Sequence, residues 1–428
     1  MMVLELDGVQ IVRHSQSIHC LEGPVMLRLN PDHSFNYELL RILGTAHDHG
    51  ADVAEVLDVA GEIVAGDFES WFDAFSKRAR HVDAQAQGFA NAGRDASARG
   101  TFFRAASYYR AADFFLHGQP DDPRIASIWK DATRCFDAAN ARLPIPGERI
   151  DVQADGFSVP AIFFRCSTDG VARPTLLLMN GYDGSQEEMY HVLGVAALSR
   201  DFNVVTFEGP GQPTVIRDQG LTFIDEWEKV VTPLVDWCQS QPEIDAGKLG
   251  LVGYSLGGWL VARSGCFEHR LAGIACVDGL FDPARAYRAS LPDSICAAID
   301  RRDASTANAA LSTAMAANTI LRWAIEQGMW AYGCATPMDL MLRFDKLTLD
   351  GIVDRITTPV LVCEGADDQF FLGQAERLAD ALGARGDHVR LTSADSASEH
   401  CHVGCSDLLG NVVLDWFESR MTNTPEPA

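Results

Sequence analysis

Positive charge is scarce in this sequence, and long apolar runs are missing from it. Its 428 residues include 35 lysines and arginines against 59 aspartates and glutamates, which gives a formal net charge of −24. Such a field repels phosphate backbones and anionic lipids, so nucleic acids and membrane surfaces are poor partners. No run approaches roughly 18 consecutive apolar residues, and the start of the chain carries charges instead of an apolar core. We therefore expect neither a membrane span nor a signal peptide.

Closely paired cysteines are lacking as well. Eleven cysteines are scattered along the chain, their number is odd, and no C-x-x-C pair occurs. A disulfide scaffold is shorter and denser in cysteine, so we interpret them as reduced thiols of a cytoplasmic protein. Hydrophobic residues make up 47% and charged residues 22%, which excludes wholesale disorder and allows two or three domains.

The spacing of apolar residues divides the chain into a helical first part and a second part of alternating strands and helices. Apolar residues recur every three or four positions between 33 and 140, and a break at L-P-I-P-G, 143–147, ends this pattern. Short runs rich in Val, Ile and Leu then alternate with helical segments, which is typical of an α/β domain with a mostly parallel sheet. We expect a helical domain at 1–147, an α/β core at 148–281 and 357–421, and a flexible tail at 422–428.

Within the second part, the expected strands are short and the expected helices amphipathic. A hairpin is predicted at 149–154 and 159–165, followed by strands at 175–179, 203–207, 249–252, 273–277, 360–363 and 388–392. The predicted helices are 185–198, 221–240, 256–267, 372–382 and 408–419, the first of them with a Ser185–Glu188 capping box. No strand is expected at 282–356, which we interpret as a helical cap inserted above the ligand-binding edge of the sheet.

The sequence G-Y-S-L-G at 253–257 is the strongest chemical signal. It follows a predicted strand and precedes a predicted helix, which is the context of a nucleophile elbow. In that strained turn a serine hydroxyl projects above the sheet, and the helix N-terminus supplies amide donors for an oxyanion. We therefore predict Ser255 as a catalytic nucleophile.

A serine nucleophile needs a base and an acid that orients the base, and in this architecture they follow in the order Ser, Asp, His. The strand at 360–363 leads to Asp367 and Asp368, and we favour Asp368. After the last strand, the sequence E-H-C-H offers two histidines, of which we favour His400 over His402. No spacing of further acids or histidines supports a metal site there.

An oxyanion hole needs a second backbone donor. The loop N-G-Y-D-G at 180–184 follows the strand that would face the elbow. We predict the amides of Tyr182 and Leu256 as the donors, with Asp183 as the alternative to Tyr182. Three other acids stand near predicted strand ends and are interpreted as structural hydrogen-bonding groups: Glu208, Asp278 and Asp282.

With these motifs in place, the chain resembles the α/β-hydrolase superfamily. The closest resemblance is to a branch that includes 2,6-dihydropseudooxynicotine hydrolase and fungal polyketide chain-shortening and fusarin-pathway-type hydrolases. It rests on A-A-S-Y-Y-R-A-A at 105–112, N-G-Y-D-G at 180–184, T-F-E-G-P-G-Q at 206–212 and G-Y-S-L-G-G at 253–258. Members of the branch usually continue G-P-G-Q with glycine, whereas this chain has Pro213.

The resemblance implies a hydrolase that acts on a small carbonyl compound without a cofactor. It implies cleavage of a carbon–carbon bond next to a carbonyl, or of an ester, thioester or lactam, in secondary metabolism or aromatic catabolism. It further implies a homodimer in which the N-terminal helices help to close the pocket. Two alternatives keep the same fold: a cyclase or acyltransferase that uses the same triad, and a ligand-binding protein without catalysis.

Overall fold

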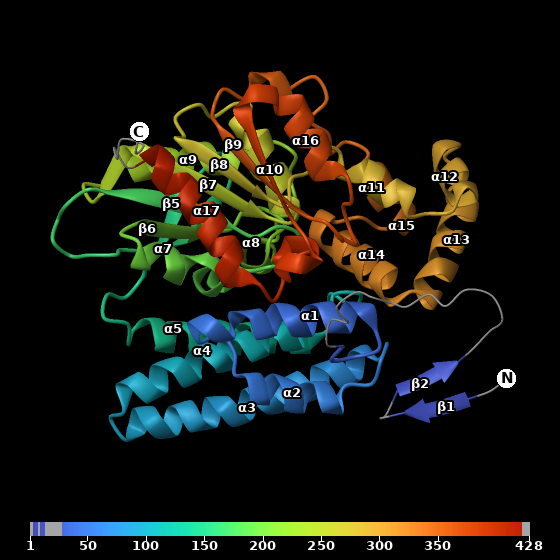
Figure 1. The fold of residues 1–428 in the computed structure, drawn as a ribbon, viewed down its shortest axis with the longest axis horizontal. Coiled ribbons are helices and arrows are strands. Elements are labelled where there is room, and N and C mark those ends of the chain that lie inside the picture. Colours follow the sequence, from blue (N-terminus) through green and yellow to red (C-terminus); the bar gives the residue numbers. More distant parts are fainter. Residues whose placement is uncertain (1–2, 7–8, 13–27, 422–428) are drawn as a thin grey trace.

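An eight-stranded, mostly parallel sheet forms the centre of the molecule (Figure 1). The computed structural model describes residues 3–6, 9–12 and 28–421. The strands lie in the order β10-β9-β8-β7-β5-β6-β4-β3, and only β3–β4 and β4–β6 pair antiparallel. Their bounds are β3 Glu148–Gln153, β4 Ser158–Phe164, β5 Arg173–Met179, β6 Asn203–Phe207, β7 Ile244–Tyr254, β8 Gly273–Val277, β9 Val360–Gly365 and β10 Gly386–Leu391.

The predicted strands and the mostly parallel sheet are therefore present, and the largest difference in length is at β7. β7 begins five residues before the predicted start at Leu249, because Arg173 of β5 pairs with Ile244 across an irregular register. β6, β8 and β9 are buried along their whole length. The strand order reverses at β5, where the chain runs first to β6 and later back to β7. In open α/β sheets, a crevice forms at the carboxyl ends of the strands beside such a reversal.

The helices of the α/β part cover both faces of the sheet (Figure 1). They are α6 Gln186–Met189, the π-helical turn η2 Tyr190–Gly194, α7 Val195–Ser199, α8 Pro213–Gln219, α9 Glu228–Gln239, α10 Leu256–Gly265, α16 Gln374–Leu382 and α17 Ser406–Met421, with short 3₁₀ turns at η4 Gly383–Arg385, η5 Ser393–Asp395 and η6 His400–His402. The helix predicted at 221–240 forms only from Glu228 onward. The helix α8 was not predicted; it begins at Pro213, whose fixed φ suits a first helical position.

Only one of the two hydrogen bonds of the predicted capping box at Ser185 is present. The Ser185 hydroxyl accepts the Glu188 N–H at 3.3 Å. The Glu188 carboxylate does not return to the Ser185 amide, because it binds Arg41 and Asn180 instead. Tertiary ion pairing thus overrides the local capping pattern at this helix start.

Five helices from the first third of the chain form a layer against one face of the α/β part (Figure 1). They are α1 His33–Gly44, α2 Val53–Glu62, α3 Phe68–Asn91, α4 Asp95–Ala112 and α5 Pro123–Asn140. One hydrophobic core runs from these helices into the sheet: Phe103 stacks on Tyr190, with ring centroids 5.3 Å apart, and Tyr190 lies 4.8 Å from Phe164 of β4.

Before these helices, a two-stranded hairpin of β1 Val3–Leu6 and β2 Val9–Val12 was not predicted. The rest of the start of the chain and the expected flexible tail at 422–428 lie outside the described residues. Two expectations therefore stay predictions: that the start of the chain holds no signal peptide, and that its end is frayed.

Residues 282–356, between β8 and β9, contain helices and loops and no strand, as predicted. The helices are α11 Pro283–Ala289, α12 Asp293–Asp300, α13 Ala304–Ala317, α14 Thr319–Tyr332, α15 Pro337–Phe344 and the 3₁₀ turn η3 Val353–Arg355. These inserted helices lie beside the carboxyl ends of the strands, where α14 also contacts α1 (Figure 1). Among the described helices, none is both long and apolar enough to cross a membrane.

Candidate active site

Ser255 occupies a strained turn between β7 and α10. Its φ of 58° and ψ of −128° lie in a region that residues with a side chain rarely adopt. The turn can close because its neighbours are glycines: a Cβ at Gly253 would collide with the Gly257 carbonyl, and one at Gly258 with the Asp278 carbonyl. The sequence thus builds the predicted elbow, and the Ser255 hydroxyl faces a cavity.

The three residues predicted as a triad lie together. His400 Nε2 is 2.8 Å from Ser255 Oγ, and His400 Nδ1 is 2.9 Å from Asp368 Oδ2. The other oxygen of Asp368 accepts the N–H groups of Phe370 and Phe371, at 2.7 and 2.9 Å. The acid is therefore fixed by its own loop, and it can hold the imidazole with Nε2 toward the serine.

The alternatives weighed from the sequence lie elsewhere. Asp367 is exposed, while Asp368 is buried. His402 is buried, but its Nδ1 is 2.6 Å from the Ala397 carbonyl and it makes no hydrogen bond to Ser255. The geometry therefore favours Asp368 and His400.

The predicted oxyanion donors face the elbow. Gly181 packs so closely that a Cβ there would lie 2.7 Å from the Leu256 nitrogen. In the described part of the chain, neither the Tyr182 nor the Leu256 N–H has a hydrogen-bond acceptor, so both are free to bind an oxyanion. The Asp183 N–H also lacks one there, so the choice between Tyr182 and Asp183 stays a prediction.

The loop that carries Tyr182 is held by the inserted helices. The Tyr182 hydroxyl donates to the Ala324 carbonyl of α14 at 2.8 Å, and Gln327 Nε2 donates to the Tyr182 carbonyl at 3.1 Å. Gly328 makes room for this contact, because a Cβ there would collide with the Tyr182 hydroxyl.

A largely buried ion cluster, which the sequence did not reveal, holds the same loop from the other side. Arg41 of α1 binds Glu188 with two hydrogen bonds of 2.6 and 2.7 Å, and Asp183 at 2.8 Å. Arg110 of α4 donates to the Asp183 carbonyl at 3.0 Å. Glu38 completes the cluster, and burial raises its pKa to about 7. No sequence signal could show this cluster, because its members come from three distant segments.

The cavity above Ser255 measures about 780 Å³ and is partly open to solvent. Many side chains in its walls are aromatic, and they come from α1, the loop after β5, the end of β7, the inserted helices and the loop after β9. These aromatic side chains are Tyr37, Tyr182, Tyr254, Tyr287, Trp323, Phe370 and Phe371. At one end of the cavity, Arg41, Asp183 and Glu188 provide charged groups. Such a chamber suits a small organic molecule with an apolar body and polar substituents.

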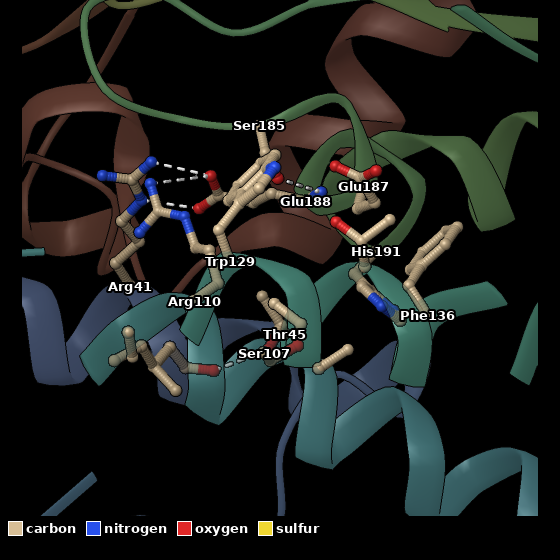
Figure 2. A pocket seen from close by; sticks show the side chains of 15 residues that line it. Arg41, Thr45, Ser107, Arg110, Trp129, Phe136, Ser185, Glu187, Glu188 and His191 are labelled. Atoms are coloured by element: carbon tan, nitrogen blue, oxygen red, sulfur yellow. Dashed lines mark hydrogen bonds and ion pairs between the residues drawn. The ribbon is translucent and has the colours of Figure 1, made fainter. Parts of the chain in front are cut away.

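A second cavity, of about 580 Å³, lies between the N-terminal helices and residues 185–191 (Figure 2). It shares Arg41 and Glu188 with the cavity above Ser255 but is not lined by Ser255 or His400. His191, on its wall, binds the Asp48 carbonyl, and burial lowers the pKa of its imidazole to about 4. The chemistry predicted from the sequence therefore belongs to the first cavity.

The three acids interpreted as structural differ in their surroundings. Glu208 accepts the N–H groups of Gln186 and Thr214, at 2.7 and 2.5 Å, and so joins the starts of α6 and α8. Asp282 caps α11 by accepting the Arg285 N–H. Asp278 is different, because its Oδ2 lies 2.7 Å from His400 Nδ1. The sequence pointed to its strand end but not to this contact.

Asp278 and His400 also lie close to Cys401, and the three are the only metal-ligand type cluster in the described part of the chain. Both ring nitrogens of His400 already face Ser255 and the two carboxylates. Burial raises the pKa of the Cys401 thiol, which keeps it in the protonated form that binds metals poorly. The imidazole of His400 is therefore better placed to pair with Ser255 and the carboxylates than to bind a metal ion.

This fold and site define a protein of the α/β-hydrolase class. The chain belongs to the Alpha/beta hydrolase family, whose model matches residues 176–406. It is 33% identical to the 20-hydroxy-prefusarin hydrolase FUS2 of Gibberella moniliformis over 90% of this chain and 96% of that protein. It is 29% identical to the hydrolase acrC of Aspergillus aculeatus, covering 84% and 89% of the two chains.

Among solved structures, the fold is similar to that of a 2,6-dihydroxy-pseudo-oxynicotine hydrolase. The TM-score is 0.71 at 20% identity, with 90% of this chain and 97% of that chain covered. AbyA5 is also similar, with a TM-score of 0.58 at 17% identity and coverage of 86% and 95%. These comparisons confirm the predicted fold class and the predicted branch of hydrolases.

Proposed function

We propose that the protein is a serine hydrolase that cleaves a small carbonyl compound through Ser255, His400 and Asp368. The observation that carries the proposal is the 2.8 Å contact between His400 Nε2 and Ser255 Oγ, beside two backbone amides that have no acceptor in the described part of the chain. Hydrolase relatives over nearly the whole chain support the same reaction class.

The geometry supports the following steps. His400 Nε2 takes the Ser255 hydroxyl proton while Oγ attacks the substrate carbonyl, and the Tyr182 and Leu256 amides bind the resulting oxyanion. The tetrahedral adduct collapses, and His400 gives its proton to the leaving group. Water then loses a proton to His400, attacks the acyl-enzyme and releases the acid, and Ser255 Oγ regains its proton.

The bond that breaks depends on the leaving group. In a β-dicarbonyl substrate it is an enolate carbon, and protonation by His400 completes a retro-Claisen cleavage. In an ester or thioester it is an alkoxide or thiolate. We propose a substrate of secondary metabolism with an apolar, conjugated body, because aromatic side chains from several elements line the cavity and because one relative is named as a hydrolase of 20-hydroxy-prefusarin.

We expect the inserted helices to act as a cap, the chain to form a homodimer and the protein to reside in the cytoplasm. Light scattering after size-exclusion chromatography tests the dimer. Cell fractionation tests the location.

The proposal is tested with Ser255→Ala and a fluorophosphonate probe. We expect the variant to keep its fold, to lose the label and to lose turnover of p-nitrophenyl acetate by about 10⁴-fold or more. Ser240→Ala, at an exposed serine whose hydroxyl bonds only to neighbouring groups of its own segment, is the matched control. Turnover in ¹⁸O-labelled water should place one labelled oxygen in the acid product. Full activity of Ser255→Ala would overturn the proposal.

A further inference from the structure

Two carboxylates, rather than one, meet the inner nitrogen of His400. Nδ1 lies 2.7 Å from Asp278 Oδ2 and 2.9 Å from Asp368 Oδ2. All three side chains are nearly enclosed, with 4% of His400, 2% of Asp278 and 4% of Asp368 exposed. Asp278 directly follows β8, Asp368 follows β9, and these strands are neighbours in the sheet.

Each carboxylate is fixed by backbone donors of its own. Asp368 Oδ1 accepts two N–H groups of its loop. Asp278 Oδ2 accepts the Cys401 N–H at 2.7 Å, which ties it to the segment that carries His400. Asp278 Oδ1 has no hydrogen-bond partner among the described groups and lies 3.7 Å from His402 Nε2. The two acids therefore hold the imidazole from two separate parts of the fold.

We propose that Asp278 is a second positioning acid for His400: the Nδ1–H bonds to Asp368, and Asp278 places a second carboxylate within ion-pair distance of the same nitrogen. The inference deepens the proposed function and rests on the role of His400 as base. In a standard triad one acid selects the tautomer with Nδ1–H and stabilises the imidazolium. Here Asp368 and Asp278 both contribute to these tasks. Asp278 also connects the imidazole to the backbone of Cys401, whose N–H it accepts.

The charges around the site agree with this division. Burial alone would lower the pKa of His400, but the charges of Asp368, Cys401, Tyr37 and, last in size, Asp278 raise it well above its usual range. Burial alone would raise the pKa of Asp278, yet His400 holds it at about 2. The titratable groups that face His400 and Asp278 are Tyr37 of α1, Tyr254 of β7, Tyr287 of α11, Cys363 of β9, Asp368, and, on the same segment, Glu399, Cys401 and His402.

The carboxylate of Asp278, as a second negative charge beside His400, should affect how the rate depends on pH. His400 must be neutral to accept the serine proton, so the rate falls when the pH drops below the pKa of the imidazole. Removing one of two neighbouring carboxylates lowers that pKa. The acid limb of the rate profile should therefore move to lower pH when either acid is neutralised.

The test compares Asp278→Asn, Asp368→Asn and the double variant. In Asp278→Asn the side-chain amide oxygen can still accept the Cys401 N–H, so this substitution removes charge and keeps the backbone contact; Asp278→Ala removes both. For kcat/KM on p-nitrophenyl acetate, we expect each single Asn variant to shift the acid limb down by about one pH unit. We expect each to lose far less than the ~10⁴-fold typical of a triad that loses its only acid, and the double variant to approach that loss.

A second measurement does not depend on turnover. In the Ser255→Ala background, ¹⁵N NMR of labelled histidine reports the titration of His400 with and without Asp278→Asn. A lower imidazole pKa in the Asn variant supports the inference, even if the proposed hydrolase activity is never observed. An unchanged titration and an unchanged acid limb, with activity lost only in step with thermal stability, would overturn it and leave Asp278 a structural residue.

Discussion

Two buried acids outside the predicted triad, Glu208 and Asp278, have pKa values that are shifted in opposite directions. Burial is the largest influence on each and favours the neutral carboxyl group. At Glu208 the nearby charge of Glu187 adds to this effect, and the pKa rises to about 7. At Asp278 the imidazole of His400 outweighs it, and the pKa falls to about 2. The difference lies in the partner: backbone amides satisfy Glu208, while a potential cation stabilises ionised Asp278.

Glu208 should therefore make the stability of the fold depend on pH. Its pKa is raised from 4.5 to about 7 in the folded state. The stabilisation is thus complete below about pH 4.5 and is lost as the pH rises through about 7, a change of about 3 kcal/mol at most. We expect Glu208→Gln, which cannot ionise, to show a smaller loss of unfolding free energy between about pH 5 and pH 8 in urea titrations.

The control for this prediction is Glu226→Gln, at an exposed acid of the loop before α9. It should follow the wild-type dependence on pH. Parallel curves for wild type and Glu208→Gln would show that Glu208 does not change its protonation state in this range.

At the scale of elements, α1 and α14 hold the loop that carries Tyr182 from two sides. Arg41 of α1 binds Asp183 and Glu188, while Ala324 and Gln327 of α14 bind Tyr182. The predicted oxyanion donor thus depends on two helices that lie outside the sheet. Because they position this loop, the N-terminal layer and the inserted helices can both influence the rate of the proposed reaction.

Arg41→Met should lower both the unfolding free energy of the protein and its kcat. The substitution leaves the largely buried Glu188 and Asp183 with Arg110 as their remaining cation, at 3.6 and 3.5 Å, so we expect a cost below the roughly 3–5 kcal/mol of a fully buried pair that loses one partner. We expect a matching drop in unfolding free energy by urea titration, and a lower kcat because the loop loses its anchor. Arg41→Lys keeps the charge but not the two-pronged contact and should lie between. Wild-type stability of Arg41→Met would contradict the buried ion cluster.

Gly328→Ala should disturb the other side of the loop. The added methyl group would collide with the Tyr182 hydroxyl, so α14 or the loop must shift. Overpacking of this kind typically costs about 1–3 kcal/mol, and we expect kcat to fall with it. Gly88→Ala is the matched control, because a Cβ at this position of α3 meets no atom within 4 Å. It should raise the melting temperature slightly. Equal effects of both substitutions would disprove the proposed contact.

At the scale of the whole molecule, the N-terminal helices and the sheet share one hydrophobic core. Buried residues of α1, α3, α4 and α5 form one cluster with Ile162, Leu176 and Val252 of the strands. The inserted helices belong to a second cluster, which continues through β5 and β7 to α9 and α10. Both clusters include residues of the same strands, so neither layer can separate without exposing the sheet.

We therefore expect the full chain to unfold in one calorimetric transition, although its sequence divides into several parts. A chain that lacks residues 1–147 should be insoluble or should bind a hydrophobic dye, because it exposes the apolar face that α1, α4 and α5 cover. Two separate transitions, or a soluble and active truncated chain, would show that the helical layer folds independently.

Much of the fold could be predicted because its signals are local. Strands such as β6 and β8 are uninterrupted apolar runs, and their ends agree with the predicted ranges. The elbow at Ser255 needs glycines at fixed spacing, which a sequence shows directly. The errors arose where tertiary contacts act: Glu188 left its capping position for Arg41, and the segment before Glu228 did not form the expected helix.

The sequence by itself determined the fold class, the elbow and the order of Ser255, Asp368 and His400, because strand and turn chemistry is written in neighbouring residues. Only the tertiary structure decided which side chains surround them. It joined Arg41, Asp183 and Glu188 at one end of the cavity, and it brought Asp278 to the nitrogen that Asp368 also contacts. Such contacts join residues far apart in the chain, and burial then sets their charge; neither the distance nor the burial can be read from local pattern.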